Sequence, residues 1–409
     1  MNGPPTPAGR PAVASARVAD YEPGAVRDAV AGLVGRLGGM SRFVKPGQRV
    51  LVKPNLLAPM PPEKAVTTHP AVVDAVLALV VGAGGKPVVG DSPGVGRTQT
   101  VAAACGLLPV LEKHGAPLAD FTTEVVTHHP ENTLGKVLTV ARAVTEADVL
   151  ITLPKLKNHG QMILTCAVKN QYGLVPGVLK GQYHFRFMDA DRLADLMVDL
   201  NRAYRPALAV MDAVTAMEGD GPSGGDPRHV GVLAASDDVM ALDLFACGLI
   251  GLDPDLVPTV RAARRQGFGP GRLEDVDVWG PSAEALRVPD FKPVGHLHDV
   301  LRIAPLPRPI LRWMRRQWAP RPVIVPARCV GCNRCRDGCP VTPTAIDPAS
   351  SWRGKVDRHR CIRCYCCHEF CPARAIELKR SVLDRTLKIN RTLNRLGDLA
   401  ARLVHPRRR

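Results

Sequence analysis

The strongest constraint on this 409-residue chain is a cysteine pattern that occurs twice in its last 81 residues. The two copies, residues 329–340 and 361–372, both read C-x2-C-x2-C-x3-C-P. Cysteines at this close spacing allow one short loop to wrap three corners of a metal centre, and the proline turns the chain away after the fourth. Disulfides are the alternative, but no export signal is recognisable and C-x-x-C spacing favours metal in a reducing cytoplasm.

The doubled spacing resembles the bacterial two-cluster ferredoxin module over about residues 325–380. In that module the fourth cysteine of each copy ligates the cluster held by the other copy. The resemblance therefore implies two [4Fe–4S] clusters. One would be held by Cys329, Cys332, Cys335 and Cys371, and the other by Cys361, Cys364, Cys367 and Cys339.

Two alternatives bear on this array. Zinc also binds four cysteines, but the repeat of all three spacings with both prolines argues against it. Cys366 falls outside the repeat, at the place of Arg334 in the first copy. We expect Cys366 to be a bystander, with a substitute ligand or an oxidant sensor as the other interpretations.

The remainder of the chain alternates β-rich runs with helical ones. We predict strands over residues 49–55, 147–155, 207–214 and 229–236, a strand followed by a turn over 86–94, and a helix over 69–85. Asp237 is the predicted N-cap of a helix that follows it. This alternation predicts an α/β domain with a mostly parallel, helix-covered sheet. A small α+β ferredoxin-like iron–sulfur domain would follow it.

The predicted organisation has five parts. Residues 1–20 form a flexible leader, 21–292 the α/β domain, 293–324 a Pro- and Arg-rich linker, 325–380 the iron–sulfur domain, and 381–409 a basic amphipathic helix and tail. The last helix either packs on its own protein or faces a partner or a membrane surface. No uninterrupted apolar run has the length of a membrane span.

The charge is concentrated at the C-terminal end. Residues 302–409 contain 25 Lys and Arg against 7 Asp and Glu, a formal net charge of +18, whereas the remainder has 29 basic and 31 acidic residues. Two cubane clusters with eight thiolates carry about −4 in total, so compensation explains only part of the excess. Docking to an acidic partner or a membrane is the other interpretation, and nucleic acid is not expected because no reading motif accompanies the charge.

Polar residues gather where the predicted strands end, which is where ligands bind in such sheets. Lysines bind carboxylate or phosphate groups and can donate protons when burial lowers their pKa. We therefore predict an anionic small-molecule substrate. The predicted substrate-binding residues are Lys53, Asn55, Asp91, Ser92, Lys157, Asn170 and Asp212. The predicted catalytic residues are His159, Lys155 and Lys169.

Several segments that carry these residues resemble the DUF362 family over about residues 45–255. They include VLVKPNLL (50–57), TTHP (67–70), GDSPG (90–94) and the lysine-rich segment 153–177. Members of this family often carry a C-terminal ferredoxin module, but its general activity is unsettled, so the resemblance implies architecture rather than chemistry. No Walker A or G-x-G-x-x-G sequence is present. Cys105, Cys166 and Cys247 are expected in the core, and Cys166 has a catalytic role as its alternative.

Three functions fit these features. The first is a cytoplasmic iron–sulfur oxidoreductase that relays single electrons from a ferredoxin-like or other redox protein to the bound anion. The second is an electron-transfer or scaffold subunit without catalysis of its own, which docks an acidic redox partner through its basic end. The third is a sensor that couples metabolite binding to the redox state of the clusters.

Overall fold

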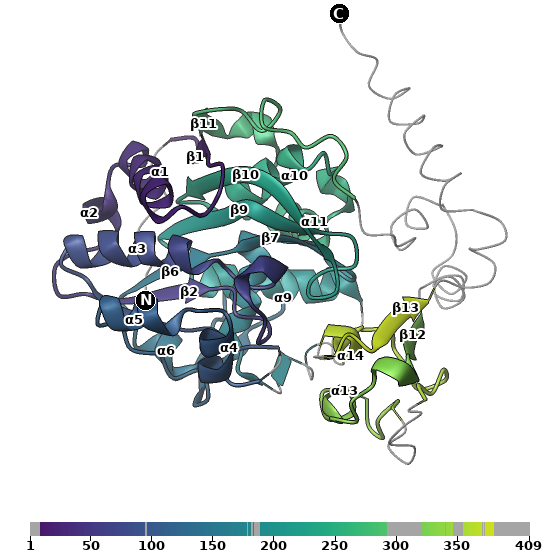
Figure 1. Cartoon of the computed structure of the whole chain (residues 1–409). Helices are drawn as coiled ribbons and strands as arrows, with labels where there is room; N and C mark the ends of the chain where they lie inside the picture. The colour runs from purple at the N-terminus through teal and green to yellow at the C-terminus, as the bar shows by residue number, and fades with distance from the viewer. Residues whose placement is uncertain are drawn as a thin grey trace, which may run out of the picture. The chain divides into compact units, whose positions relative to one another are not determined.

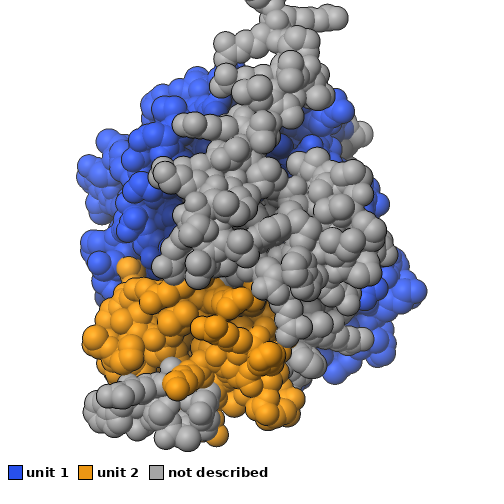
Figure 2. All heavy atoms as spheres, turned by 90° about the vertical axis from the view of Figure 1, so that its right-hand side faces the viewer, with its two compact units in different colours: residues 1–294 blue, residues 295–409 orange. Residues whose placement is uncertain are grey.

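The structure is a computed structural model that describes residues 9–94, 96–177, 179–180, 183, 189–292, 321–339, 341–346, 355–369, 371 and 373–379. The chain divides into two compact units, residues 1–294 and 295–409, coloured blue and orange in Figure 2. The predicted helix and tail over residues 381–409, and the predicted linker up to residue 320, lie outside the described residues.

A nine-stranded sheet forms the centre of the first unit. Its order is β11-β1-β10-β9-β6-β2-β3, and β7 pairs with both β9 and β8 (Figure 1). The strands are β1 (Ala12–Arg17), β2 (Arg49–Pro54), β3 (Lys86–Val89), β6 (Val149–Leu153), β7 (Lys155–His159), β8 (Ile163–Thr165), β9 (Leu208–Glu218), β10 (Asp226–Ser236) and β11 (Asp277–Trp279). Five of the described pairings are parallel and three are antiparallel. The predicted mostly parallel α/β sheet is confirmed.

Helices cover both faces of this sheet, which explains its uninterrupted apolar strands. In β2, Val50 and Val52 point into one core cluster and Leu51 into the other, as the alternation of side chains along a strand requires. The first cluster contains residues of α1 (Pro23–Arg36), α3 (Pro70–Gly82), α4 (Thr98–Ala104) and α5 (Leu108–Lys113). The second contains residues of α6 (Arg142–Thr145), α7 (Ala167–Asn170), α9 (Ala190–Ala203), α10 (Val239–Leu249) and α11 (Pro258–Arg265).

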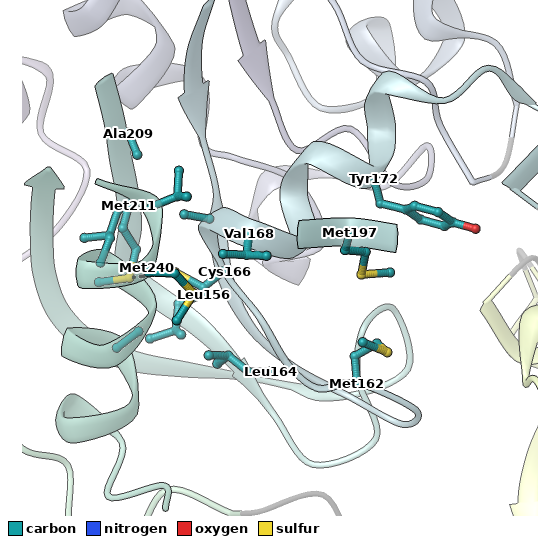
Figure 3. Packing of buried hydrophobic residues seen from close by; sticks show 14 of the residues in the cluster. Leu156, Met162, Leu164, Cys166, Val168, Tyr172, Met197, Ala209, Met211 and Met240 are labelled. Atoms are coloured by element: carbon teal, nitrogen blue, oxygen red, sulfur yellow. Dashed lines mark hydrogen bonds between the residues drawn. The ribbon is translucent and has the colours of Figure 1, made fainter. Parts of the chain in front are cut away.

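Four methionines and two cysteines belong to the second cluster, among many aliphatic residues. Figure 3 shows Met211, Met240 and Cys166 together, and Met162 and Met197 in another part of the same cluster. Their unbranched, polarizable side chains adapt to irregular gaps between sheet and helices. The three cysteines predicted to be core residues, Cys105, Cys166 and Cys247, are all buried.

This unit also contains the helix α2 (Met40–Phe43) and a separate hairpin of β4 (Glu124–His128) and β5 (Val137–Ala141). The cap of α10 differs from the prediction. Asp238, whose backbone is extended, accepts hydrogen bonds from the N–H groups of Met240 and Ala241. Asp237 instead pairs with Arg42 at 2.6 Å.

Two other predictions about this unit are wrong. Residues 12–17, assigned to a flexible leader, form β1 between β10 and β11, because small apolar side chains at this position fit a buried strand. The lysine-rich segment, predicted to run from loop to helix, begins as the hairpin of β7 and β8 and reaches α7 only at Ala167.

The second unit consists of short elements. β12 (Arg321–Ile324) pairs antiparallel with β13 (Ile376–Lys379), and the helices are α13 (Arg334–Asp337) and α14 (Cys366–Glu369). Residues 321–324, predicted to belong to the linker, are therefore a strand of this unit. Its described hydrophobic cluster has only Ile346, Cys367 and Ile376 as buried members. Among the described residues of the chain, no helix is long and apolar enough to cross a membrane.

Candidate functional site

The first unit buries three of the predicted site lysines. Lys53 is the next-to-last residue of β2, and Lys155 and Lys157 lie on β7. The three are the largest fully buried side chains among the described residues. A lysine is almost never fully buried unless its charge is compensated. The partners of these lysines therefore define the site.

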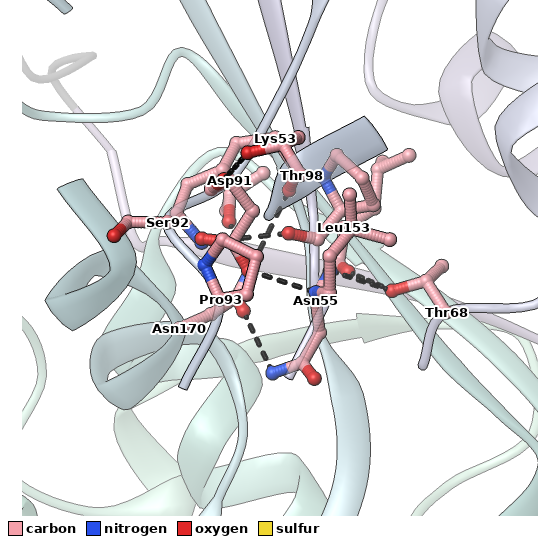
Figure 4. A network of polar contacts seen from close by, with 12 residues as sticks. Lys53, Asn55, Thr68, Asp91, Ser92, Pro93, Thr98, Leu153 and Asn170 are labelled. Carbon is pink, nitrogen blue, oxygen red and sulfur yellow. Dashed lines mark hydrogen bonds and ion pairs between the residues drawn. The ribbon is translucent and has the colours of Figure 1, made fainter. Parts of the chain in front are cut away.

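Lys53 pairs with Asp91, which follows β3, at 2.9 Å between Nζ and Oδ1. The second oxygen of Asp91 accepts a hydrogen bond from the N–H of Leu56 at 2.8 Å, so the carboxylate is held from two sides. Gly173 lies against this pair, because an added Cβ there would be 2.0 Å from Asp91 Oδ1 and 2.8 Å from Lys53 Nζ. Figure 4 shows the pair within its polar surroundings.

Lys155 pairs with Asp212 at 2.8 Å, and the two are direct neighbours in the register of β7 and β9. Tyr21 completes this pair. Its hydroxyl accepts from Lys155 Nζ at 2.8 Å and donates to Asp212 Oδ1 at 2.7 Å. The other oxygen of Asp212 accepts the backbone N–H of His69 at 2.8 Å, and the His69 ring stacks on Tyr21 with centroids 3.6 Å apart.

Asparagine side chains connect the third lysine to the centre of the sheet. Lys157 Nζ donates to Asn55 Oδ1 at 2.9 Å and to the carbonyl of Val66 at 2.8 Å. The amide of Asn55 donates to Asn170 Oδ1 at 3.1 Å, and Asn170 donates onward to Thr152 Oγ1 at 2.8 Å. Because an ammonium only donates, Lys157 fixes the orientation of Asn55 and, through it, that of Asn170.

Burial sets the protonation of the site. It lowers the pKa of Lys53 and of Lys155, and the paired carboxylates Asp91 and Asp212 oppose this fall. Burial also lowers the pKa of His69 to about 4, with Asp212 raising and Lys155 lowering it. His69 is thus neutral near pH 7, and its Nδ1 accepts from the N–H of Ala71 at 3.2 Å, which places the remaining proton on Nε2.

Three predicted residues lie elsewhere in this arrangement. His159 is buried, and its Nδ1 accepts the N–H groups of Gln161 and Met162 at 3.1 Å, so that one ring nitrogen holds the turn between β7 and β8. Ser92 Oγ accepts from Gly177 N at 2.8 Å and Lys180 Nζ at 3.0 Å. Lys169 lies beside Asn170 on α7 and is half-buried, in contrast to the other three lysines.

Sequence reasoning missed Tyr21 and Asp243. Tyr21 stands at the edge of the predicted leader, and no local pattern marks it as a partner of Asp212. Asp243 accepts the N–H of Ala167 at 2.6 Å at the start of α7, and burial raises its pKa to about 7. The thiol of Cys166 also bonds to Asp243, and burial raises the pKa of this thiol, which supports its assignment to the core. His69 had a signal, since it lies in the segment TTHP.

The cysteines of the second predicted group lie together. One cavity is lined by Cys339, Cys361, Cys364 and Cys367, which combine the last cysteine of one copy with the first three of the other. Burial raises the pKa of the Cys335 thiol to about 11, and negative charge on Cys371, Cys332 and Cys329 adds to the rise. The charges of Cys371, Cys332 and Cys329 therefore act on Cys335, in line with the first predicted group.

The two cysteine loops share an unusual backbone. Gly331 and Asn333 in the first loop, and Arg363 and Tyr365 at the equivalent places in the second, have φ between 54° and 68°. This left-handed conformation is costly for residues other than glycine, and turns of this kind aim successive N–H groups into a concavity that suits anions. Backbone N–H groups do reach cysteine sulfurs, as from Ala375 to Cys371 at 3.1 Å.

These features fit a [4Fe–4S] cluster in each group, because each cluster takes four thiolates and accepts N–H hydrogen bonds at its sulfurs. The described residues contain no group of three or more His, Cys, Asp or Glu side chains arranged for a single metal ion. A cubane differs from such a site because it spreads its four cysteines over four iron atoms.

Comparison with known proteins identifies the first unit. Residues 50–248 match the family model described as "Domain of unknown function (DUF362)". The chain is 42% identical to "Thylakoid-associated protein sll1697" of Synechocystis sp. over 259 residues. This match covers 63% of this chain and 80% of that protein. The chain belongs to the DUF362 family. The DUF362 match contains all predicted site residues of the first unit, whereas Tyr21 lies before it.

One solved structure has a weaker similarity. It is the lactate racemase apoprotein from Thermoanaerobacterium thermosaccharolyticum, with a TM-score of 0.35 and 14% identity. The match covers 58% of this chain and 56% of the racemase chain. Similarity at this level supports no conclusion about fold or function.

Proposed function

We propose that this DUF362 protein is an iron–sulfur oxidoreductase whose C-terminal unit is a two-cluster ferredoxin-type module and whose first unit binds an anionic small molecule. The observation that carries the proposal is the crossed grouping of eight cysteines. It is supported by Cys339, which lines one cavity with the three cysteines of the second loop, and by the charge of Cys371, which acts on Cys335 of the first loop. When bound, the clusters would supply transfer of single electrons.

Two features of the backbone around the cysteines suit a cluster. The left-handed residues bend each loop around its cysteines, and N–H groups of Arg336, Arg363 and Ala375 reach the sulfurs of Cys335, Cys361 and Cys371. Such hydrogen bonds favour the thiolate over the thiol. They are also one of the means by which a protein adjusts the potential of a cluster.

The DUF362 domain supplies cations at a water-poor site. Lys53 and Lys155 are fully buried with lowered pKa values, so each gives up a proton more readily than an exposed lysine. Lys155 is the best placed to act on a ligand, because the adjoining Tyr21 and His69 are only half-buried. A carboxylate or phosphate that approaches Lys155 past this aromatic pair would also meet the Nε2–H of His69.

Individual roles follow from these positions. Lys53, Lys157, Asn55 and Asn170 hold the shape of the site, while Lys155 binds the anion and is the proposed proton donor. Asp91 and Asp212 keep Lys53 and Lys155 charged against the cost of burial. His159 and Lys169 remain proposed proton carriers at the edge of the network.

A second candidate function is an electron-transfer or scaffold subunit without its own catalysis. The net charge of +18 over residues 302–409 favours it, because a strongly basic region attracts acidic redox proteins. In this case the DUF362 domain would hold the partner or a ligand that it does not transform.

The first experiment measures iron, acid-labile sulfide and the EPR spectrum of anaerobically purified protein after reduction with dithionite. We expect about eight irons per chain and two interacting reduced clusters. Cys367→Ser should reduce the iron content or alter the spectrum, whereas Cys366→Ser, at the adjacent position outside the repeat, should not. Four irons or fewer in the wild type after anaerobic reconstitution would overturn the two-cluster proposal.

The role of the DUF362 site is tested separately. Lys155→Met should abolish stabilisation of the protein by inorganic phosphate or by a panel of carboxylates in thermal-shift measurements, while its iron content stays that of the wild type. Lys86→Met, at an exposed position on β3, is the matched control. Equal ligand stabilisation in both variants would exclude Lys155 as the anion-binding residue.

A further inference from the structure

We propose that an acidic electron-transfer protein docks on the first cysteine loop, at a surface formed by Val330, Cys332, Arg334 and Arg336. This docking surface rests on the proposed function, and it specifies where electrons enter. Its residues lie on and just before α13, which is labelled in Figure 1.

Exposure distinguishes the two cysteine groups. Cys332 is exposed, whereas Cys329, Cys335 and Cys371 of the same group are half-buried. In the other group Cys339, Cys361 and Cys364 are half-buried and Cys367 is buried. The first group therefore has the ligand nearest to solvent, and electron transfer from another protein favours the shortest approach.

Two arginines lie close to Cys332 in the chain. Arg334 and Arg336 are exposed, and neither makes an ion pair within the part of the chain that the structure describes. Two other exposed arginines of this unit are paired, Arg328 with Glu377 and Arg360 with Asp357. Arg334 and Arg336 are thus available to carboxylates of another protein, and Asp337 on the same helix offsets only one of the two charges.

An apolar side chain stands next to these arginines in the chain. Val330 is 69% exposed, the highest value among the large hydrophobic residues described as exposed. An apolar contact within a polar rim is the usual composition of a transient protein interface. Attraction between opposite charges then accelerates association and makes it dependent on salt.

The positive charge could serve two alternative roles, and both have weaker support. Compensation of cluster charge needs only about four positive charges, and Arg334 and Arg336 point to solvent rather than being buried beside the cysteines. An anionic membrane would also attract arginines, but one valine offers little surface for insertion, and a lipid surface supplies no electrons.

The test uses the full iron-loaded chain and an acidic plant-type [2Fe–2S] ferredoxin as the probe. Binding is measured by fluorescence anisotropy at several salt concentrations, with iron content and the dithionite-reduced EPR spectrum recorded for every variant. We expect Arg334→Glu/Arg336→Glu to weaken binding at least tenfold and to flatten the salt dependence. Arg334→Gln/Arg336→Gln should have a smaller effect in the same direction.

The control is Lys86→Glu/Lys136→Glu, which makes the same change of charge at two exposed positions of the first unit. Binding by this control should equal that of the wild type. Equal weakening in both double variants would show that only net charge matters and would overturn the docking surface. Arginine-dependent binding to phosphatidylglycerol vesicles without binding of the ferredoxin would overturn it in favour of a membrane surface.

The iron measurements separate this inference from the proposed function. A wild-type protein with eight irons whose ferredoxin binding ignores both arginines would refute the docking surface and leave the two clusters intact. Failure to bind iron would instead refute the proposed function.

Discussion

The two units place their reactive side chains by different means. In the first, buried lysines, carboxylates and asparagines are held between two hydrophobic clusters that cover both faces of a nine-stranded sheet. In the second, six of the eight cysteines stand in loops and two in short helices, and the hydrophobic cluster has three buried members, one of them Cys367. Hydrophobic packing holds the side chains of the first site in place, whereas the cysteines of the second have only a small hydrophobic cluster beside them.

This difference indicates where each unit obtains its stability. A unit with a small core usually depends on metal, since binding energy then contributes directly to folding. A large apolar framework can instead carry the cost of buried charge and needs no ligand to hold its shape. The following predictions test this contrast, beginning with the largest expected effect.

Removal of iron should unfold the second unit and leave the first folded. We expect anaerobic chelation to abolish slow amide exchange in β12 and β13, because their few apolar contacts cannot replace the metal–thiolate bonds. Exchange in β2, β6 and β9 should not change. Hydrogen–deuterium exchange with mass spectrometry on the full chain measures both, and reconstitution with iron and sulfide should restore the protection. Persistent protection of β12 and β13 would contradict the contrast.

Breaking the pair of Asp212 and Lys155 should strongly destabilise the first unit. Asp212→Ala leaves a fully buried ammonium without its carboxylate, and we expect a loss of about 3–5 kcal/mol in the free energy of unfolding. Urea denaturation followed by circular dichroism measures this loss. The double variant Asp212→Leu/Lys155→Met should recover most of it, because apolar residues of similar volume can replace a buried ion pair. A double variant as unstable as Asp212→Ala would show that the buried charge is not the cause.

A methyl group at Gly173 should disturb the other pair. The added carbon would overlap Asp91 Oδ1, so Gly173→Ala should lower the free energy of unfolding by about 1–3 kcal/mol, as overpacking of a core does. Gly32→Ala in α1 is the control, since no atom lies within 4 Å of its added carbon. A helical glycine replaced by alanine is expected to gain about 0.5–1 kcal/mol. Similar changes in the free energy of unfolding for the two variants would show that a methyl group fits at Gly173.

The smallest predicted effect concerns one proton on His69. Its pKa in the folded protein is about 4, below the ordinary value of 6.5, so the folded state resists protonation. As the pH falls below 6.5, the unfolded chain takes up a proton that the folded protein refuses until about pH 4. Acidification through this window should therefore destabilise the first unit through His69. NMR titration of the ring gives the pKa, and a value near 6.5 would contradict its buried, stacked environment.

Much of this architecture was predictable because it depends on short-range patterns. Apolar runs predict the strands over residues 49–55, 207–214 and 229–236, and β2, β9 and β10 lie there. The same patterns fail for the leader, because β1 consists mainly of small residues whose strand character depends on the neighbours β10 and β11.

The expectation that polar residues after strands converge also holds for part of the site. Lys53 meets Asp91, and Lys157 meets Asn55, because parallel strands bring their carboxyl ends to one edge. The roles assigned to these residues stay predictions. For His159, the sequence offered a side chain with two available nitrogens, but the hairpin turn engages one of them.

The sequence by itself determined the two cysteine loops and the mostly parallel sheet, because loop spacing and side-chain alternation act over a few residues. The crossed grouping of the cysteines stays a prediction from the resemblance to the ferredoxin module. Only the tertiary structure decided how the lysines are compensated. Tyr21 and Asp212 lie 191 positions apart in the chain, and they meet because the segment after β1 reaches β9. A hydrogen bond between such distant residues leaves no periodic trace, since it depends on the packing of whole elements rather than on neighbours in sequence.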